Sequence, residues 1–276
     1  DATVTARFST TSENYETPEP LTAKITVVKA KYVTTGVSFD NATATYDGQP
    51  HRPAVSGALP RGLDGIQVTV AGYEGSQTDV GYSYVTVRFA TTSENYETPE
   101  SRTAMITVNP LSRVIAWSDD PLTYNGTEQS PVPSFVDIND VKHTLDVAQK
   151  YILAGNYTAT AVTTGDDLKN YSFTNETKTK AYTIGKAKYD MTGVGFSDTT
   201  VTYNGKMQCI EITGSLPRGL DGTSPEVSYS EGLRDIGETT VTVTFKSVSK
   251  NYYDPEPKTA KLTVEKMDVV IQWDRT

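Results

Sequence analysis

The sequence predicts an all-β protein built from small modules in tandem, and three observations support this fold class. Short segments alternate apolar with polar residues: in the stretch TTVTVTF, Val241, Val243 and Phe245 share one face, as in a strand with one buried side. Turn signals such as Asn125-Gly126 separate these segments. Several motifs recur about every 78 residues, which is too long for one turn of a solenoid and suits a small globular module.

Two motifs set the length of the repeat. The stretch TTSENYETPE stands unchanged at 10–19 and 91–100, and looser copies begin at Asp166 and Ser247. The Asn-Tyr pair that all copies share begins at Asn14, Asn95, Asn170 and Asn251. A Tyr-Asp/Asn-Gly motif begins at Tyr46, Tyr124 and Tyr203. Because both motifs recur at nearly the same interval, the chain is predicted to be an array of one duplicated module.

The copies alternate between two types. The motif Leu-Pro-Arg-Gly-Leu-Asp-Gly occurs at 59–65 and 216–222 and skips the middle copy, whereas VIAW at 114–117 returns as VIQW at 270–273. The predicted division is the C-terminal half of a repeat at 1–30, a type A repeat at 31–110, a type B repeat at 111–187, a type A repeat at 188–266, and the first strand of a further repeat at 267–276.

Each complete repeat is predicted to hold about six or seven short strands, rich in the Thr, Val and Tyr that suit half-buried pleated surfaces. In chain order, the strands before the Asn-Tyr pairs are TVTARF (3–8), YVTVRF (84–89), AGNYTATAV (154–162) and TTVTVTF (239–245), and closing strands include AMITV (104–108) and AKLTV (260–264). One segment leaves an alternative open. From Asp140 the spacing of Val141, Leu145 and Ala148 also fits a short helix, although strand-forming residues interrupt it.

These features form one ordered series: Tyr-x-Gly near the front, a Gly before an alternating strand, then Asn-Tyr, then a closing strand. The series resembles the bacterial immunoglobulin-like repeats of the MBG (Tyr-Gly-x) type that occur in tandem in large cell-surface and secreted proteins. The resemblance covers all three complete repeats and both partial ones. It implies small immunoglobulin-like β-sandwich modules arranged end to end, and it offers no catalytic residues to carry over. The long Leu-Pro-Arg-Gly-Leu-Asp-Gly loop and the alternation of types depart from the general pattern.

Net charge and composition restrict the classes of partner and of metal site that the chain could have. The 25 Lys and Arg against 34 Asp and Glu give a formal net charge of −9, which argues against nucleic acid or an anionic membrane surface as partner. Cys209 is the only cysteine, so no intrachain disulfide can form. Cys209, His51 and His143 together are too few ligands for a Cys/His zinc site unless carboxylates join them. No stretch is long and apolar enough to insert into a membrane.

No enzyme chemistry is indicated. The two histidines stand at unrelated places in the repeat, so no nucleophile, base and carboxylate recur together, and no Gly-rich phosphate loop opens a helix. No cofactor is expected. Calcium between repeats is the alternative, held by carboxylates with carbonyl oxygens, and its candidate ligands are Asp119, Asp120, Asp166 and Asp167.

The repeated loop is the one candidate site. Its Pro and Gly residues have conformational reasons, and Arg61 could pair with Asp64 across it, as Arg218 could with Asp221. A structural connection kept by duplication is the favoured interpretation. The alternative is a recognition tip, in which the Arg and the carboxylate bind a carboxylated sugar or a protein.

The recurring aromatic residues are interpreted as structural. Tyrosines at fixed places in the repeat are expected to pack with a satisfied hydroxyl rather than to bind sugars. Trp117 and Trp273 are expected to anchor the core or the seam between repeats.

Taken together, the residues predict a non-catalytic spacer or stalk segment of a cell-surface or secreted adhesin-like protein. Its partners would be neighbouring repeats of a longer chain, and short linkers would hold those repeats end to end. The alternative is direct binding of host glycan or protein by the Leu-Pro-Arg-Gly-Leu-Asp-Gly loops. Residues 1–30 lack the front strands of their own repeat, so a strand-mediated contact with another chain is expected there.

Overall fold

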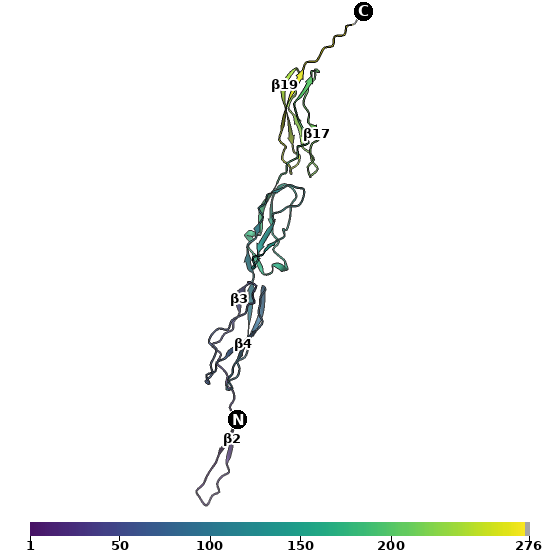
Figure 1. Ribbon diagram of the computed structural model, residues 1–276. Helices are drawn as coiled ribbons and strands as arrows, with labels where there is room; N and C mark the ends of the chain where they lie inside the picture. The colour runs from purple at the N-terminus through teal and green to yellow at the C-terminus, as the bar shows by residue number, and fades with distance from the viewer. Residues whose placement is uncertain (274–276) are drawn as a thin grey trace. The chain divides into compact units, whose positions relative to one another are not determined.

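The computed structural model describes residues 1–273, and in them the chain is all-β (Figure 1). Its only helical turns are two short 3-10 segments, η1 (Asp166–Leu168) and η2 (Asn175–Thr177), within the described residues. The helix considered from Asp140 does not form, and strand β11 (Lys142–Thr144) lies there instead. The residues form two compact units, one of Asp1–Ser112 with Gly165–Ser172, the other of Arg113–Thr164 with the chain from Phe173 on.

The first unit begins with an isolated hairpin. Strands β1 (Ala2–Ala6) and β2 (Leu21–Ile25) pair antiparallel in a two-stranded sheet. Every residue of both strands is exposed, including Val4 and Leu21. Two strands cannot bury an apolar face by themselves, so this hairpin has no core of its own.

The main sheet of the first unit has four strands in the order β3-β6-β5-β4, from β3 (Ala42–Thr45), β4 (Thr69–Glu74), β5 (Gly81–Ala90) and β6 (Arg102–Asn109). The period-two pattern of the sequence is realised in β5, where Val85 and Val87 are fully buried. The first strand, β3, runs parallel to the last, β6, and the other pairs are antiparallel.

The second unit contains the same sheet again in residues 199–265. The order is β16-β20-β19-β18, from β16 (Thr199–Thr202), β18 (Glu226–Tyr229), β19 (Gly237–Lys246) and β20 (Lys258–Glu265), and β16 again runs parallel to β20. Val241, Val243 and Leu262 are fully buried in its core. A separate short pair joins β15 (Val194–Gly195) to β17 (Thr213–Gly214).

The part of the second unit that precedes this sheet has shorter strands in two sheets. One has the order β11-β10-β8, with β8 (Ala116–Trp117) and β10 (Pro133–Val136). The other has the order β12-β14-β9, with β9 (Leu122–Thr123), β12 (Gly155–Thr160) and β14 (Thr179–Gly185), and β9 runs parallel to β14. Strands β7 (Leu111–Arg113) and β13 (Tyr171–Phe173) complete the inventory of the described residues.

The number of strands differs among the predicted repeats. Residues 188–266 contain the six strands β15 to β20, within the expected six or seven, but residues 31–110 contain only the four strands β3 to β6, and residues 111–187 contain the eight strands β7 to β14. The segments that pair as β15 and β17 in the later copy are reduced in the earlier one to a single bridge between Ser38 and Ser56. Short segments flanked by glycine support one pair of hydrogen bonds without extending into a ladder.

The end of the described chain is unpaired. Residues 267–273, expected to begin a further repeat, adopt no strand, and Trp273 is 87% exposed rather than packed against a core or seam. Residues 274–276 of that expected strand lie outside the described residues.

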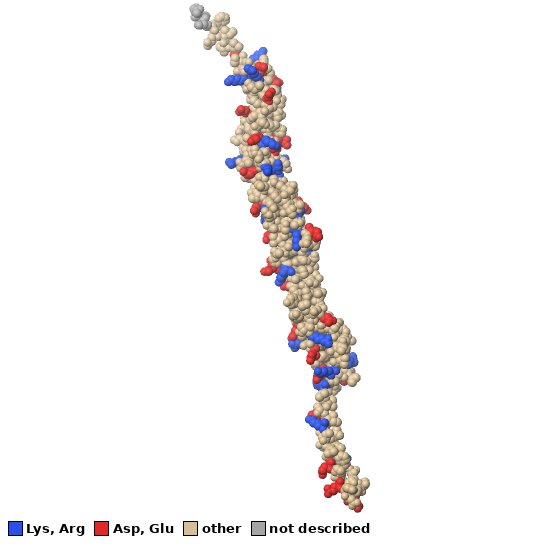
Figure 2. Space-filling view, turned by 180° about the vertical axis from the view of Figure 1, so that it is seen from behind, with Lys and Arg blue, Asp and Glu red and all other residues tan. Residues whose placement is uncertain are grey.

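Figure 2 shows acidic and basic side chains interspersed over the visible face.

Candidate functional site

The Asn-Tyr pair of each complete repeat is hydrogen-bonded to the segment at the start of that repeat. The backbone N–H of Ala187 donates to the carbonyl of Asn251 at 2.8 Å, and Tyr253 donates back to Ala187 at 3.0 Å. Ala30 and Asn95 make the same contact at 2.8 Å. Leu111 donates to the carbonyl of Asn170 at 3.0 Å. The backbone of the motif therefore fastens the linker to the module that follows it.

In the second unit, the side chain of this motif also reaches the preceding repeat. Asn251 is 7% exposed, and its Oδ1 accepts a hydrogen bond from the N–H of Ala154 at 3.0 Å. Its Nδ2 donates to Asp221 Oδ2 at 3.3 Å. Both ends of a buried amide are thus satisfied, one by its own repeat and one by its neighbour. We call this set of contacts the second joint.

The tyrosine beside Asn251 completes the second joint. The ring of Tyr252 stacks on Tyr189 with centroids 4.2 Å apart and meets Tyr124 edge-on at 5.6 Å. Its hydroxyl accepts from the N–H of Leu220 at 2.8 Å. Tyr124 belongs to the Tyr-Asn-Gly motif of the preceding repeat, so two recurrent sequence motifs meet at this point.

The first unit contains the same arrangement, which we call the first joint. Asn170 Oδ1 accepts from the N–H of Val80 at 2.8 Å, and its Nδ2 donates to Asp79 Oδ1 at 2.9 Å. The ring of Tyr171 meets Tyr46 edge-on at 5.7 Å. In both joints the donor to the asparagine is the residue directly before the glycine that opens a long strand, Val80 before Gly81 and Ala154 before Gly155.

In both copies of the Leu-Pro-Arg-Gly-Leu-Asp-Gly loop, the arginine is hydrogen-bonded within the loop itself. Arg61 Nη1 donates to the carbonyl of Gly65 at 2.5 Å, and Arg218 Nε donates to that of Gly222 at 3.0 Å. The ion pairs among residues 1–273 do not include the pairs that the sequence allowed, of Arg61 with Asp64 and of Arg218 with Asp221. The arginines brace the loop backbone instead of meeting the carboxylates.

Each loop aspartate accepts a hydrogen bond from the serine two residues before the Asn-Tyr pair. Ser249 Oγ donates a short hydrogen bond to Asp221 Oδ2 and accepts from the N–H of Asn251 at 2.9 Å. In the earlier copy, Ser93 Oγ donates to Asp64 Oδ2 at 2.5 Å and accepts from the N–H of Asn95 at 3.0 Å. The loop therefore sets the position of the asparagine through an Asp-Ser relay.

A glycine in the loop is required by the tyrosine. A Cβ added at Gly219 would lie 2.7 Å from Tyr252 Cε2, and one added at Gly62 would lie 2.7 Å from Tyr96 Cε2. The backbone of the loop thus passes directly over the aromatic ring. The close approach gives this glycine a packing reason in addition to the conformational one predicted from the sequence.

The carboxylates at the joints are held in the charged form. For Asp221, desolvation by burial raises the pKa, but hydrogen bonds led by those from Ser249 and Thr223 outweigh it and lower the pKa to about 2. The hydrogen bond from Asn170 lowers the pKa of Asp79, and Lys169 adds to this. Each ionised carboxylate is a fixed acceptor that orients the asparagine amide.

Sequence reasoning missed part of each joint. Asp79 supplies to Asn170 the acceptor that Asp221 supplies to Asn251, but it comes from the preceding repeat rather than from a loop of the same one. The donors Val80 and Ala154 contribute only backbone N–H groups, which leave no side-chain signal. The recurrence of a Gly after each of them was the available sign.

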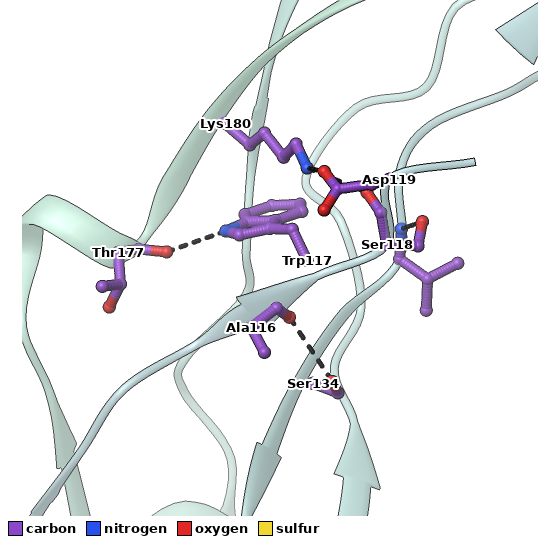
Figure 3. Close-up of polar contacts among 8 residues, drawn as sticks. Ala116, Trp117, Ser118, Asp119, Ser134, Thr177 and Lys180 are labelled. Atoms are coloured by element: carbon purple, nitrogen blue, oxygen red, sulfur yellow. Dashed lines mark hydrogen bonds and ion pairs between the residues drawn. The ribbon is translucent and has the colours of Figure 1, made fainter. Parts of the chain in front are cut away.

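The aspartates considered for calcium belong to no cluster of metal-ligating side chains in the described residues. Within residues 1–273 no group of three or more His, Cys, Asp or Glu side chains is placed to hold a metal ion. Asp119 pairs with Lys180, whose ammonium also donates to the carbonyl of Ser118 at 2.9 Å (Figure 3). Trp117 beside them is partly buried and donates from Nε1 to the carbonyl of Thr177 at 2.9 Å, so it anchors β8 within its own repeat.

Comparison of the sequence with models of known protein families and with curated proteins gives no match. No helix in residues 1–273 is long and apolar enough to span a membrane.

Proposed function

We propose that the chain is a non-catalytic spacer segment whose immunoglobulin-like modules are held in line by the Asn-Tyr joints. One observation carries the proposal: two asparagines, in different units, make the same side-chain contact to the residue before a strand-opening glycine. Side-chain geometry that recurs where one repeat meets the next favours a role in joining modules. The partners of each module are then its neighbouring repeats.

The contacts of a joint are of a size that would limit hinge motion. A hydrogen bond from a buried backbone N–H contributes about 0.5–1.5 kcal/mol, and an aromatic pair adds about as much beyond its buried area. The second joint combines the bond from Ala154 with rings of Tyr124 and Tyr252. Such a joint would have one preferred geometry rather than the freedom of a flexible linker.

The resemblance to MBG repeats extends the proposal to location. Repeats of that type stand in large cell-surface and secreted bacterial proteins, so the segment would act outside the cell, within an adhesin-like protein. It would hold another domain at a distance. Direct ligand binding by the Leu-Pro-Arg-Gly-Leu-Asp-Gly loops is less favoured, because Arg61 and Arg218 already donate to their own loop carbonyls.

The test is to remove one asparagine side chain from the full chain. Asn251→Ala leaves the Ala154 N–H without its acceptor, and we expect a loss of about 1–3 kcal/mol in the free energy of unfolding. Nitroxide labels at Lys142→Cys and Glu226→Cys, in a Cys209→Ser background, report the distance between the two repeats of the second unit. We expect a narrow distance distribution that broadens in Asn251→Ala.

The matched control is Asn204→Ala. Asn204 caps a local turn by accepting from the N–H of Lys206 at 2.9 Å and belongs to neither joint, so its loss should leave the distance distribution narrow. A distribution that is equally narrow in Asn251→Ala, or already broad in the unaltered chain, would overturn the proposal.

A further inference from the structure

A groove of about 860 Å³ lies in the second unit between the linker at 186–191 and the loop at 246–258. The linker contributes Lys186 and Lys188, and the loop side contributes Lys246, Tyr253 and Lys258. The groove borders the second joint, because Tyr189, Ser249 and Tyr252 also line it, but its lysines and Tyr253 make none of the side-chain contacts described for that joint. Neither the spacer role nor the joint geometry requires it.

The groove concentrates positive charge in an acidic protein. Four lysines line it against two acidic residues, Asp254 and Glu256, whereas the whole chain has a formal net charge of −9. Lys246 pairs with Asp254 at 2.7 Å. The ion pairs among residues 1–273 include neither Lys186 nor Lys188, and both lysines are exposed. Two ammonium groups at the groove are therefore available to an anion.

An exposed aromatic ring lies among these charges. Tyr253 is 52% exposed, and the ammonium of Lys186 lies 5.9 Å from the centroid of its ring. Met191, Pro255 and Pro257 add apolar surface to the lining. A ring face next to free ammonium groups suits a ligand that has both an apolar face and negative charges.

The earlier type A repeat provides an internal comparison. Its corresponding groove is about 360 Å³, and Glu97 stands there where the later copy has Tyr253. Ala90 stands where the later copy has Lys246. Lys31, the counterpart of Lys188, lies 3.9 Å from the carboxylate of Glu97. The change from Glu97 to Tyr253 gives the later groove its ring and removes a negative charge, whereas the charge of Lys246 is offset by Asp254, which stands where the earlier copy has Thr98.

We propose that the groove at 186–258 binds a short acidic saccharide, one bearing carboxylate or sulfate groups. A sugar ring has an apolar face that stacks on Tyr253, and its anionic groups accept hydrogen bonds from Lys186 and Lys188. A long phosphate polymer fits less well, because it would extend past the four lysines onto a surface of net negative charge. The type A repeats would then share the contact of the loop aspartate with the serine before Asn-Tyr and differ in the groove.

The experiment titrates the full chain with two tetrasaccharides, one of hyaluronan and one of chondroitin sulfate, by calorimetry and by amide NMR at low salt. The hyaluronan tetrasaccharide has carboxylates and no sulfate, so comparing the two ligands shows whether carboxylates alone are enough for binding or sulfate is needed. Lys186→Gln with Lys188→Gln should weaken binding by about ten-fold or more, as the loss of two charge-assisted contacts implies. Tyr253→Glu, which installs the residue of the earlier repeat, should weaken it as strongly.

The matched control is Lys29→Gln with Lys31→Gln, the same change at the counterpart positions of the earlier repeat, and it should leave the affinity unchanged. The proposal is overturned if the unaltered chain binds neither tetrasaccharide, or if the control weakens binding as much as the change at Lys186 and Lys188. Equal or tighter binding of a single-stranded oligonucleotide would also overturn it. All of these substitutions are at exposed side chains, and an unchanged unfolding temperature verifies the fold of each variant.

Discussion

At the scale of the residue, the asparagine of the Asn-Tyr pair unites two functions in one amide. Its oxygen accepts from a backbone N–H of the preceding repeat, and its nitrogen donates to a carboxylate. Aspartate in its place could not donate, and leucine could do neither. The dependence on both atoms of the amide accounts for the use of asparagine, rather than another polar residue, at the two joints.

The carboxylate at the second joint makes its contribution dependent on pH. Because the pKa of Asp221 is lowered in the fold, its contribution to stability is present above the ordinary value of 3.8 and is lost as the pH falls toward about 2. The unfolding temperature of the unaltered chain should therefore fall more steeply over this interval than that of Asp221→Asn. Calorimetric scans at several pH values provide the measurement, and parallel slopes for the two proteins would contradict the assignment.

At the scale of the element, the alternation of apolar residues was enough to predict the long strands. Val85, Val87 and Val241 are fully buried as the period of two requires. The pattern failed where strands are short, because a segment that forms one bridge, such as that at Ser38, carries too few residues to show a period. The joints could not be predicted, since Val80 and Ala154 act through backbone groups and Asp79 acts across two repeats.

The two four-stranded sheets should depend on their central apolar residues. Leu262 of β20 is fully buried, so Leu262→Ala should lower the free energy of unfolding by about 2–5 kcal/mol through lost burial and a cavity. Thr259→Ala, on the exposed side of the same strand, should change it by about 0.5 kcal/mol or less. Urea denaturation followed by far-ultraviolet circular dichroism compares the two, and similar losses would show that the core is not centred there.

At the scale of the whole molecule, the hairpin of β1 and β2 stands out because it has unpaired strand edges and no core. Both of its outer edges lack a partner strand in the two-stranded sheet, and Val4, Leu21 and Ile25 are exposed. Open edges beside apolar side chains favour addition of a further strand from another chain.

We therefore expect the amides of residues 2–6 and 21–25 to exchange rapidly in dilute, monomeric protein and to become protected as concentration rises. Hydrogen exchange read by mass spectrometry, with sedimentation at the same concentrations, tests this. Full protection in a monomer would refute the expectation of a strand-mediated contact.

The parallel pairing of an early strand with the last strand of each repeat has a mechanical consequence. In each complete repeat an early strand runs parallel to the last strand and beside it, as β3 with β6, β9 with β14 and β16 with β20. The bridges at Ala30 with Tyr96 and at Ala187 with Tyr252 are parallel too. Tension applied to the two ends of a repeat would load these hydrogen bonds together in shear rather than open them one after another. The same pairing that forms the sheet would therefore resist traction along the chain.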